Sequence, residues 1–302
     1  MKKLRIATRE SALALWQANH VKALLEKRHA GLACDIVGMT TEGDRNKVSP
    51  LSQMGGKGVF VKELEMALLA GDADIAVHSM KDVPAELPSG LGITAICERA
   101  SPLDAFVANR YASLDRLPEG AVVGSSSLRR VLQIGATYPH LDFQELRGNV
   151  DTRLRKLDEQ QYDAIILAVA GLTRLGLMER ITDEIAPEVC LPAAGQGAVG
   201  IESRLDDSET LDLLAGINDD STWTEVNAER RVTMALGATC NLPIAVYAQA
   251  AGGELMLRAF VADSTGDHTI REAITGTLAT SDDLAAQLGE RLLRLGAAKL
   301  IG

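Results

Sequence analysis

Short apolar runs alternate with longer amphipathic stretches along most of the chain. The apolar runs have the length of buried β-strands, and the stretches between them have the length of helices. We expect strands at residues 4–8, 34–40, 74–77, 91–97, 121–123, 141–146, 162–168 and 198–202. Helices are expected at 12–27 and 61–69, from Leu128, and after Asp151, which we predict to be a helix cap. Strands that alternate with helices in this way predict an α/β fold.

The pattern changes near residue 222. A helix there is followed by three runs of partly alternating polarity at 244–249, 255–263 and 268–277. Alternation with glycine-containing turns between the runs is typical of an antiparallel sheet. An amphipathic helix at 282–295 is expected to cover one face of that sheet. The C-terminal part is therefore predicted to be a small α/β domain.

The composition predicts a globular, acidic protein. The 302 residues are 46% hydrophobic and 24% charged, which is enough apolar material for a folded core. The formal net charge of −10 argues against a general nucleic-acid partner, which would require a basic face. No run approaches the roughly 18 apolar residues of a membrane span, and charged residues interrupt any signal-peptide core. We therefore expect a cytoplasmic protein with no membrane partner.

The four cysteines, Cys34, Cys97, Cys190 and Cys240, are far apart and form no C-x-x-C pair. This spacing predicts reduced thiols and no metal site. Most of them are expected to be small buried residues. Cys240 lies in a stretch rich in glycine and alanine, where a thiol can be accessible, and its spacing leaves both exposure and burial open.

A heptapeptide at 78–84, His-Ser-Met-Lys-Asp-Val-Pro, follows the apolar run 74–77. Because Pro84 prevents the strand from continuing, Lys81 and Asp82 are expected just beyond its carboxyl end. Open α/β sheets bind their ligands at that edge. A carboxylate beside an ammonium there can handle a cationic intermediate. A solvated ion pair in a turn is the alternative.

Basic and hydroxyl side chains recur at other strand-to-helix turns. Arg9 and Ser11 follow the first strand, and Ser11 is a candidate cap for the helix 12–27. The run Gly-Ser-Ser-Ser-Leu-Arg-Arg at 124–130 begins another helix, where N–H groups and charge favour a carboxylate or phosphate. Simple capping with exposed arginines is the alternative there. Further basic residues follow later strands, at Arg147, Arg153 and Arg174, and such a series on one edge predicts a polyanionic ligand.

Two glycine-rich segments lack the context of a nucleotide site. The cluster at 55–58 does not have phosphate-loop spacing, and we expect a flexible loop in which Lys57 and Phe60 act as a lid. Residues 195–200 match G-x-G-x-x-G but follow a loop and lead into a strand. The dinucleotide fingerprint instead follows a strand and opens a helix. We therefore predict a hinge between domains at these glycines.

Several motifs together resemble the porphobilinogen deaminase family, also called hydroxymethylbilane synthases. They are 78–84, 124–130, the run Leu-Arg-Gly-Asn-Val at 146–150, and Cys240 shortly before a proline. The resemblance covers essentially the whole chain. It implies a transferase that condenses four porphobilinogen molecules head to tail, with release of ammonia, into linear hydroxymethylbilane for tetrapyrrole and haem biosynthesis. It also implies a covalent dipyrromethane cofactor, a primer joined by a thioether to Cys240.

The same resemblance implies roles for single residues. Asp82 would be catalytic, because its carboxylate can bind pyrrole N–H groups and stabilise positive charge. The implied cofactor contacts are Lys81, Asp82, Ser125, Ser127, Arg129 and Arg130. The implied substrate contacts are Arg9, Ser11, Arg147, Arg153 and Arg174, which suit a growing chain that carries acetate and propionate groups.

A fold of two lobes, similar to those of periplasmic binding proteins, with a hinge and a small cofactor-carrying domain is also implied. Domain 1 would comprise 1–98 and 198–217, domain 2 would comprise 102–192, and domain 3 would comprise 220–302. A monomer is expected.

The chain departs from the family pattern at four positions. Thr239 stands directly before Cys240, where glycine is common in the family, and is expected to restrict the loop that carries the cysteine. Gln53 stands where a lysine is common. Ala12 and Ser125 replace a frequent proline and a frequent threonine without removing a needed group.

Two other functions compete with this one. A non-catalytic two-lobed small-molecule binding protein would need neither Asp82 nor Cys240. A Ser–Lys hydrolase would depend on Ser79 and Lys81, whose spacing is poor support for a catalytic dyad.

Overall fold

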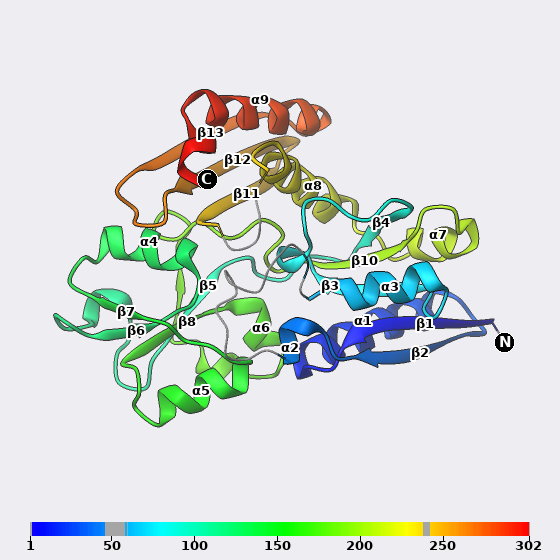
Figure 1. Cartoon of the computed structure of the whole chain (residues 1–302), viewed down its shortest axis with the longest axis horizontal. Helices are drawn as coiled ribbons and strands as arrows, with labels where there is room; N and C mark the ends of the chain where they lie inside the picture. The colour runs from blue at the N-terminus through cyan, green and yellow to red at the C-terminus, as the bar shows by residue number, and fades with distance from the viewer. Residues whose placement is uncertain (1, 46–57, 59, 238–241, 302) are drawn as a thin grey trace. The chain divides into compact units, whose positions relative to one another are not determined.

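The computed structural model describes residues 2–45, 58, 60–237 and 242–301. The chain divides into two compact units, which are drawn in Figure 1. Unit 1 comprises Met1–Ala100 and Ala198–Thr224, and unit 2 comprises Ser101–Gly197 and Glu225–Gly302. The three domains expected from the family resemblance divide the chain more finely, and their boundaries stay a prediction.

Unit 1 is built on a mixed five-stranded sheet. Its strands are β1 (Lys2–Arg9), β2 (Leu32–Met39), β3 (Ile75–Ser79), β4 (Leu91–Ile96) and β10 (Val199–Arg204). Their order is β2-β1-β3-β10-β4, with β1 parallel to β2 and β3. β10 runs antiparallel to β3 and β4, so the segment that matches G-x-G-x-x-G leads into a strand, as predicted.

Helices cover both faces of this sheet. They are α1 (Ala12–Arg28), α3 (Lys62–Ala70) and α7 (Ser208–Ala215), and the short α2 (Glu42–Arg45) follows β2. α1 packs Val21 and Leu25 against the face that carries Ile6, whereas α3 packs against the face that carries Ala7. Alternate residues of a strand point to opposite faces, so β1 contributes to both cores. The predicted cap of α1 is confirmed, because Ser11 Oγ accepts the Ala14 N–H.

Unit 2 contains a second mixed five-stranded sheet, in the order β7-β6-β8-β5-β9. Its strands are β5 (Asp104–Val107), β6 (Val122–Gly124), β7 (Asp142–Gln144), β8 (Ala164–Ala168) and β9 (Asp183–Ile185). β6 is parallel to β7 and β8, while β5 is antiparallel to β8 and β9. The sequence patterns predicted neither β5 nor β9, because both are short and are paired only by distant parts of the chain.

The helices of this sheet are α4 (Leu128–Thr137), α5 (Val150–Asp158) and α6 (Val169–Arg174). The prediction that Asp151 caps its helix is wrong. Asn149 is the cap, and its side chain accepts the Thr152 N–H at 3.0 Å. Asp151 lies within the first turn, where its negative charge still favours the helix N-terminus.

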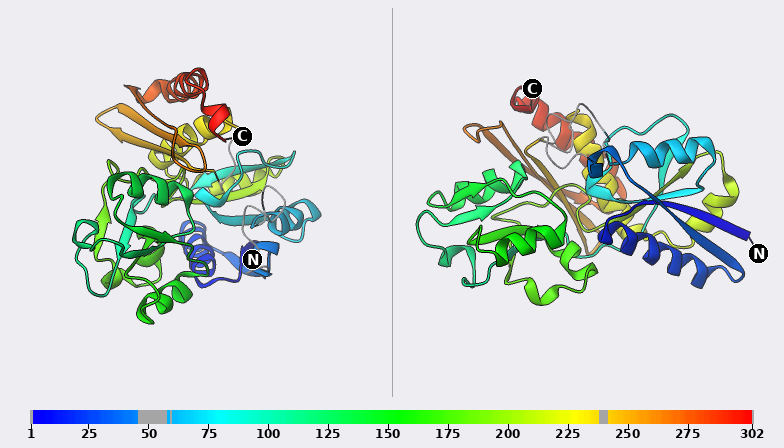
Figure 2. Two further views of the ribbon diagram at one scale, coloured as in Figure 1. Left: turned by 60° about the vertical axis from the view of Figure 1, so that its left-hand side comes forward. Right: turned by 60° about the horizontal axis from the view of Figure 1, so that its bottom comes forward.

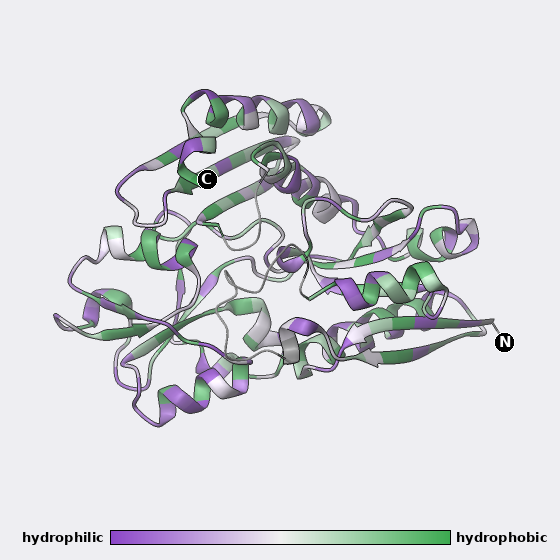
Figure 3. Ribbon diagram, viewed as in Figure 1, coloured by the Kyte–Doolittle hydropathy of each residue, from purple (hydrophilic) through white to green (hydrophobic). Residues whose placement is uncertain are grey.

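The C-terminal part of unit 2 holds an antiparallel sheet, as predicted, in the order β11-β12-β13. Its elements are α8 (Asp220–Ala235), β11 (Ile244–Ala251), β12 (Glu254–Ala262), β13 (Thr269–Thr277), α9 (Ser281–Arg294) and α10 (Ala297–Ile301). The views of Figures 1 and 2 show α9 running along the sheet. Figure 3 shows hydrophobic and hydrophilic residues on α9, and its buried Leu288 and Leu292 join the core under the sheet.

The other face of the small sheet packs within unit 2. Tyr247 and Phe260 form a cluster there with Leu191, and Leu132 of α4 packs against it. The predicted α/β class, with an antiparallel C-terminal sheet, is therefore confirmed. In the described part of the chain, no helix combines the length and apolarity that a bilayer crossing needs.

Candidate active site

The turn after β3 presents Lys81 and Asp82 at the carboxyl end of that strand. A short 3-10 helix, η2 (Met80–Asp82), follows β3 directly. Met80 is buried, and its N–H donates to Ala198 O at 3.1 Å. A Cβ on Gly200 would lie 2.0 Å from Met80 Sδ, so glycine at that position makes room for the methionine. The buried methionine anchors the turn and leaves Lys81 and Asp82 half-buried beside it.

Asp82 shares a pocket of unit 1 with residues from β1, α1 and the segment before α3. The pocket is lined by Arg9, Ser11, Leu13, Ala14, Gln17, Phe60, Val61, Val77, His78, Ser79 and Asp82. The structure thus brings together Arg9, Ser11, Phe60 and Asp82 of the predicted site residues. Lys81 is not among the lining residues.

Two contacts organise the wall of this pocket. The Arg9 guanidinium lies 4.2 Å from the centre of the Phe60 ring, a cation–π arrangement that supports the arginine from one side. Gln17 Nε2 donates to Ser79 Oγ at 2.8 Å and joins α1 to the end of β3. A guanidinium and a carboxylate in one pocket can bind a ligand that offers both an acid group and N–H donors.

A buried acid–histidine cluster adjoins the pocket. His78, which lines it, contacts Glu202 of β10 through Nε2 and Oε2 at 2.9 Å, and both side chains are buried. Burial and the neighbouring charge of Glu202 raise the pKa of Glu65 on α3 from 4.5 to about 7, while His78 opposes the shift. Glu65 therefore exchanges its proton near neutral pH.

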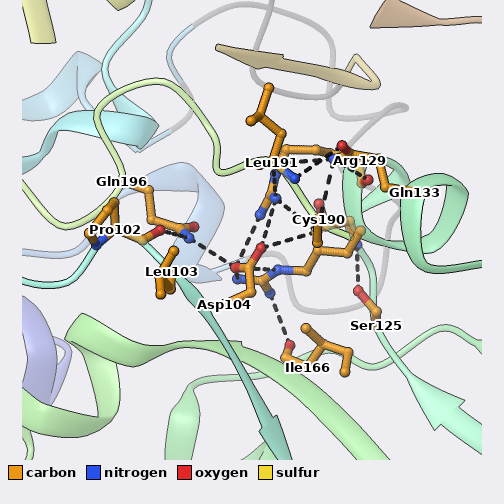
Figure 4. A network of polar contacts seen from close by, with 12 residues as sticks. Pro102, Leu103, Asp104, Ser125, Arg129, Gln133, Ile166, Cys190, Leu191 and Gln196 are labelled. Carbon is orange, nitrogen blue, oxygen red and sulfur yellow. Dashed lines mark hydrogen bonds and ion pairs between the residues drawn. The ribbon is translucent and has the colours of Figure 1, made fainter. Parts of the chain in front are cut away.

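In unit 2, Arg129 and Arg130 converge on the carboxylate of Asp104 (Figure 4). Asp104 is fully buried, and the two arginines are 4% and 5% exposed. These guanidiniums hold the pKa of Asp104 far below its usual range against the opposing effect of burial. The alternative of exposed arginines beside a simple cap is therefore wrong, since both arginines begin α4 and point inward.

The remaining predicted residues of unit 2 follow the parallel strands β6, β7 and β8. Ser125 is buried, and its Oγ accepts the Ser127 N–H at 3.2 Å. Arg147 donates to Glu145 at 2.5 Å, Arg153 donates to Gly148 O at 2.7 Å, and Arg174 donates to Gly197 O at 2.6 Å. Carboxyl ends of parallel strands meet at one sheet edge, so Ser125 and Arg147 follow the same edge, whereas Arg174 lies farther on, at the end of α6.

Lys57 and Cys240 lie outside the described residues, as do Gln53 and Thr239. The chain around Cys240 joins α8 to β11. The other three cysteines are buried and form no disulfide with one another. Burial raises the pKa of the Cys34 thiol to about 11 and that of Cys190 to about 12, so both thiols stay protonated at neutral pH.

The sequence patterns missed Asp104, Glu202, Glu65 and Gln196 as functional candidates. A charged residue within or beside an apolar strand is the signal that was available, since Asp104 begins β5 and Glu202 lies within β10. Buried charges require partners, but their partners come from distant segments. Only the fold reveals them.

Profiles of a known protein family match the chain over most of its length. The profile described as porphobilinogen deaminase, dipyromethane cofactor binding domain, matches residues 4–212. The profile for the porphobilinogen deaminase C-terminal domain matches residues 223–294. The chain belongs to the porphobilinogen deaminase family. Its function is that of a hydroxymethylbilane synthase, a transferase with a dipyrromethane cofactor that acts on porphobilinogen.

Several solved structures are similar to this chain at low sequence identity. The methionine-binding protein MetQ is 16% identical, with 73% of this chain and 92% of that chain covered and a TM-score of 0.47. A Burkholderia cenocepacia nutrient-binding protein bound to methionine is 14% identical, with coverage of 70% and 90% and a TM-score of 0.43. The Bordetella pertussis BvgS periplasmic VFT2 domain is 16% identical, with coverage of 72% and 86% and a TM-score of 0.41. At these identities and TM-scores, none of the three bears on what the porphobilinogen deaminase chain binds.

The described residues fit a dipyrromethane cofactor. Its acetate and propionate groups require cationic and hydroxyl partners, and the pocket of unit 1 offers the Arg9 guanidinium and the Ser11 hydroxyl. Its pyrrole N–H groups require an acceptor, and Asp82 offers a carboxylate at a pocket. The donor set is thus suited to an anionic ligand that carries N–H groups.

Proposed function

We propose that Asp82 is the catalytic residue of this porphobilinogen deaminase. The observation that supports this assignment is the pocket of unit 1, in which the Asp82 carboxylate shares a wall with the Arg9 guanidinium and with Ser11. Such a pocket can receive a carboxylate-bearing pyrrole by its acid group and its ring N–H together. Asp82 is half-buried, so its charge is less screened than in open water.

The chemistry requires stabilisation of positive charge. Ammonia leaves when the C–N bond of the porphobilinogen aminomethyl group breaks, and the remaining methylene-pyrrole is electron-poor. Its methylene carbon is attacked by the α-carbon of the preceding ring, which then loses its proton. Asp82 stabilises the positive charge through the pyrrole N–H and is placed to accept a proton. When bound, the dipyrromethane supplies the first pyrrole carbon for this attack.

The basic residues serve as carboxylate partners in this proposal. Arg9, Ser11, Arg147, Arg153 and Arg174 bind the substrate and the growing chain, and Lys81, Ser125, Ser127, Arg129 and Arg130 bind the cofactor. Arg147, Arg153 and Arg174 have contacts to exposed or backbone oxygens that a ligand carboxylate can replace. Arginine suits this role because its planar fork binds a carboxylate through two hydrogen bonds.

Cys240 is the covalent anchor of the cofactor in this proposal, and Lys57 and Phe60 act as a lid. Phe60 already lies over Arg9, so movement of this ring would expose or cover the guanidinium. The intact mass of the purified protein tests the anchor. We expect an increment of two linked pyrroles that is lost in Cys240→Ser, and an active protein of unmodified mass would contradict it.

Asp82→Asn tests the catalytic assignment. The substitution keeps the size of the side chain and removes its charge, so we expect retained cofactor and a loss of turnover of about 100-fold or more. Asp115→Asn is the matched control, because Asp115 occupies the middle of another 3-10 helix, η3 (Leu114–Arg116), and is exposed. Turnover of Asp82→Asn within threefold of the control would remove Asp82 from the mechanism.

We also propose that the protein acts as a cytoplasmic monomer with three domains at the boundaries stated above. The hinge glycines 195 and 197 have φ angles of 71° and 88°, which side chains rarely adopt. Light scattering on a sizing column measures the mass in solution, and a dimer mass at micromolar concentration would contradict the monomer.

A further inference from the structure

The carboxylate of Asp104 gathers more partners than a single ion pair would. Arg129 donates to it from Nη1 at 2.7 Å and from Nη2 at 3.2 Å. Arg130 donates to Oδ1 from Nε at 3.0 Å and from Nη2 at 2.7 Å. Cys190 Sγ donates to Oδ2 at 3.3 Å, and Gln196 Nε2 donates to Oδ1 at 2.9 Å (Figure 4). One buried carboxylate thus orients two arginines and one amide.

The charges of this cluster do not balance. Two guanidiniums face one carboxylate, and the neighbouring Gln133, Cys190 and Gln196 are neutral at physiological pH. The cluster therefore carries a surplus of positive charge in a buried setting, where an anion is strongly attracted. A ligand carboxylate that approached the arginines would compensate this surplus.

Gln196 connects the cluster to the places where the chain passes between its units. The chain enters unit 2 at Ser101 and leaves it after Gly197. The side chain of Gln196 donates to Pro102 O at 2.6 Å as well as to Asp104. The side-chain amide of Gln196 lies beside the point where the chain leaves unit 2. It bonds both to Pro102, beside the point where the chain enters unit 2, and to the Asp104 carboxylate, which holds the arginines.

The segment 195–197, which we call the crossing segment, is held by other charged side chains as well. The N–H of Gly195 donates to the buried Glu229 Oε2 at 2.6 Å. Gly197 O accepts from Arg174 at 2.6 Å. Its two glycines have positive φ, so the backbone is free to adopt other conformations when these contacts change. Side-chain hydrogen bonds, together with one backbone bond from the Gln196 N–H to Ala193 O at 3.0 Å, hold this segment in place without a sheet or helix.

We propose that Asp104 and Gln196 are a positioning pair, which orients Arg129 and Arg130 for ligand carboxylates and reports their occupancy to the crossing segment. This inference rests on the proposed function of the arginines. A ligand carboxylate draws guanidinium N–H groups toward itself and leaves Asp104 a better acceptor for Gln196. The hydrogen bond from Gln196 to Pro102 O then becomes stronger as carboxylates of the cofactor or the growing chain are bound.

Gln196→Leu tests the pair without leaving a buried charge unpaired, and Gln133→Leu is its matched control. Both glutamines are buried and donate from Nε2 to a backbone carbonyl, but Gln133 bonds to Arg129 O and Leu191 O, away from the crossing segment. Steady-state kinetics with porphobilinogen are measured on the holoenzymes. We expect kcat of Gln196→Leu to fall roughly tenfold, the scale of an ordinary coupling between sites, while KM changes less than twofold.

Hydrogen exchange of the holoenzyme, with and without porphobilinogen, is the second measurement. In the wild type we expect slower exchange in peptides that cover residues 193–198 when substrate is present, and we expect no slowing in Gln196→Leu. Wild-type kinetics and exchange in this variant, or equal changes in Gln133→Leu, would overturn the inference. A wild-type protein that lacks dipyrromethane and does not turn over porphobilinogen would instead overturn the proposed function and this inference with it.

Discussion

The pocket of unit 1 and the Asp104 cluster of unit 2 use the same residue types in opposite ways. In the pocket, Asp82 and Arg9 are half-buried and line an opening beside Ser11. In the cluster, Asp104 is fully buried and its two arginines are 4% and 5% exposed, and each carboxylate oxygen accepts from guanidinium groups. Accessible charges exchange partners readily, whereas buried, paired charges hold a fixed geometry and are costly to disrupt. The first arrangement suits chemistry, and the second suits orientation.

The largest expected difference between the two regions is in stability. Asp104→Asn leaves two buried guanidiniums without a counter-charge, so we expect the free energy of unfolding to fall by about 3–5 kcal/mol. Asp82→Asn should change it by less than about 1 kcal/mol, because the side chain is half-buried at a turn. Urea unfolding followed by circular dichroism measures both. Equal losses would mean that the two aspartates are not distinguished by burial.

A smaller effect is expected from the buried acid beside the pocket. The pKa of Glu65 is raised from 4.5 to about 7 in the folded protein. The folded state therefore binds a proton that the unfolded state has released between these pH values, and the free energy of unfolding falls as pH rises through this window. Glu65→Gln removes this slope. We expect the variant to gain about 1–3 kcal/mol relative to the wild type between pH 4.5 and 7.5.

Urea unfolding at several pH values measures that gain. A difference between the proteins that does not change with pH would contradict a raised pKa for Glu65.

Because the Asp104 cluster has more positive than negative charge, replacing one arginine should destabilise the protein less than replacing Asp104. Arg130→Met leaves Asp104 paired with Arg129, so the charges of the cluster then balance. The substitution also removes a bond to Ile166 O at 2.9 Å, and we expect a loss of about 1–2 kcal/mol, well below that of Asp104→Asn. A loss as large as that of Asp104→Asn, measured by the same urea titration, would contradict the surplus.

The smallest effect is expected at the aromatic support of Arg9. Phe60→Leu removes the ring that lies 4.2 Å from the guanidinium, an interaction of about 0.5–1 kcal/mol. We expect KM for porphobilinogen to rise about two- to fivefold, because this energy corresponds to that range. Tyr111→Leu is the control, since Arg110 contacts that ring at 5.5 Å on unit 2, outside the pocket. An unchanged KM in Phe60→Leu would show that the ring does not help to place Arg9.

Much of the fold followed from local pattern. The long helices α1 and α9 and the three antiparallel strands lie within a few residues of their predicted positions, because their periodicity is strong and their caps and turns are local. The strands β5 and β9 were missed, and the cap of α5 was misplaced by two residues. β5 and β9 each pair only with strands far away in the chain, so no neighbouring sequence pattern records them.

The motifs by themselves predicted the family, its reaction and its cofactor, because short segments such as 78–84 and 124–130 combine residue types in a specific way, and the matching family models confirm the prediction. The tertiary structure alone decided which charges are sealed and which are open. Arg129 and Arg9 are both arginines after a strand, yet one is bound to Asp104 in the interior and the other lines a pocket. Burial and partnership arise from segments far apart in the chain, so no local pattern records them.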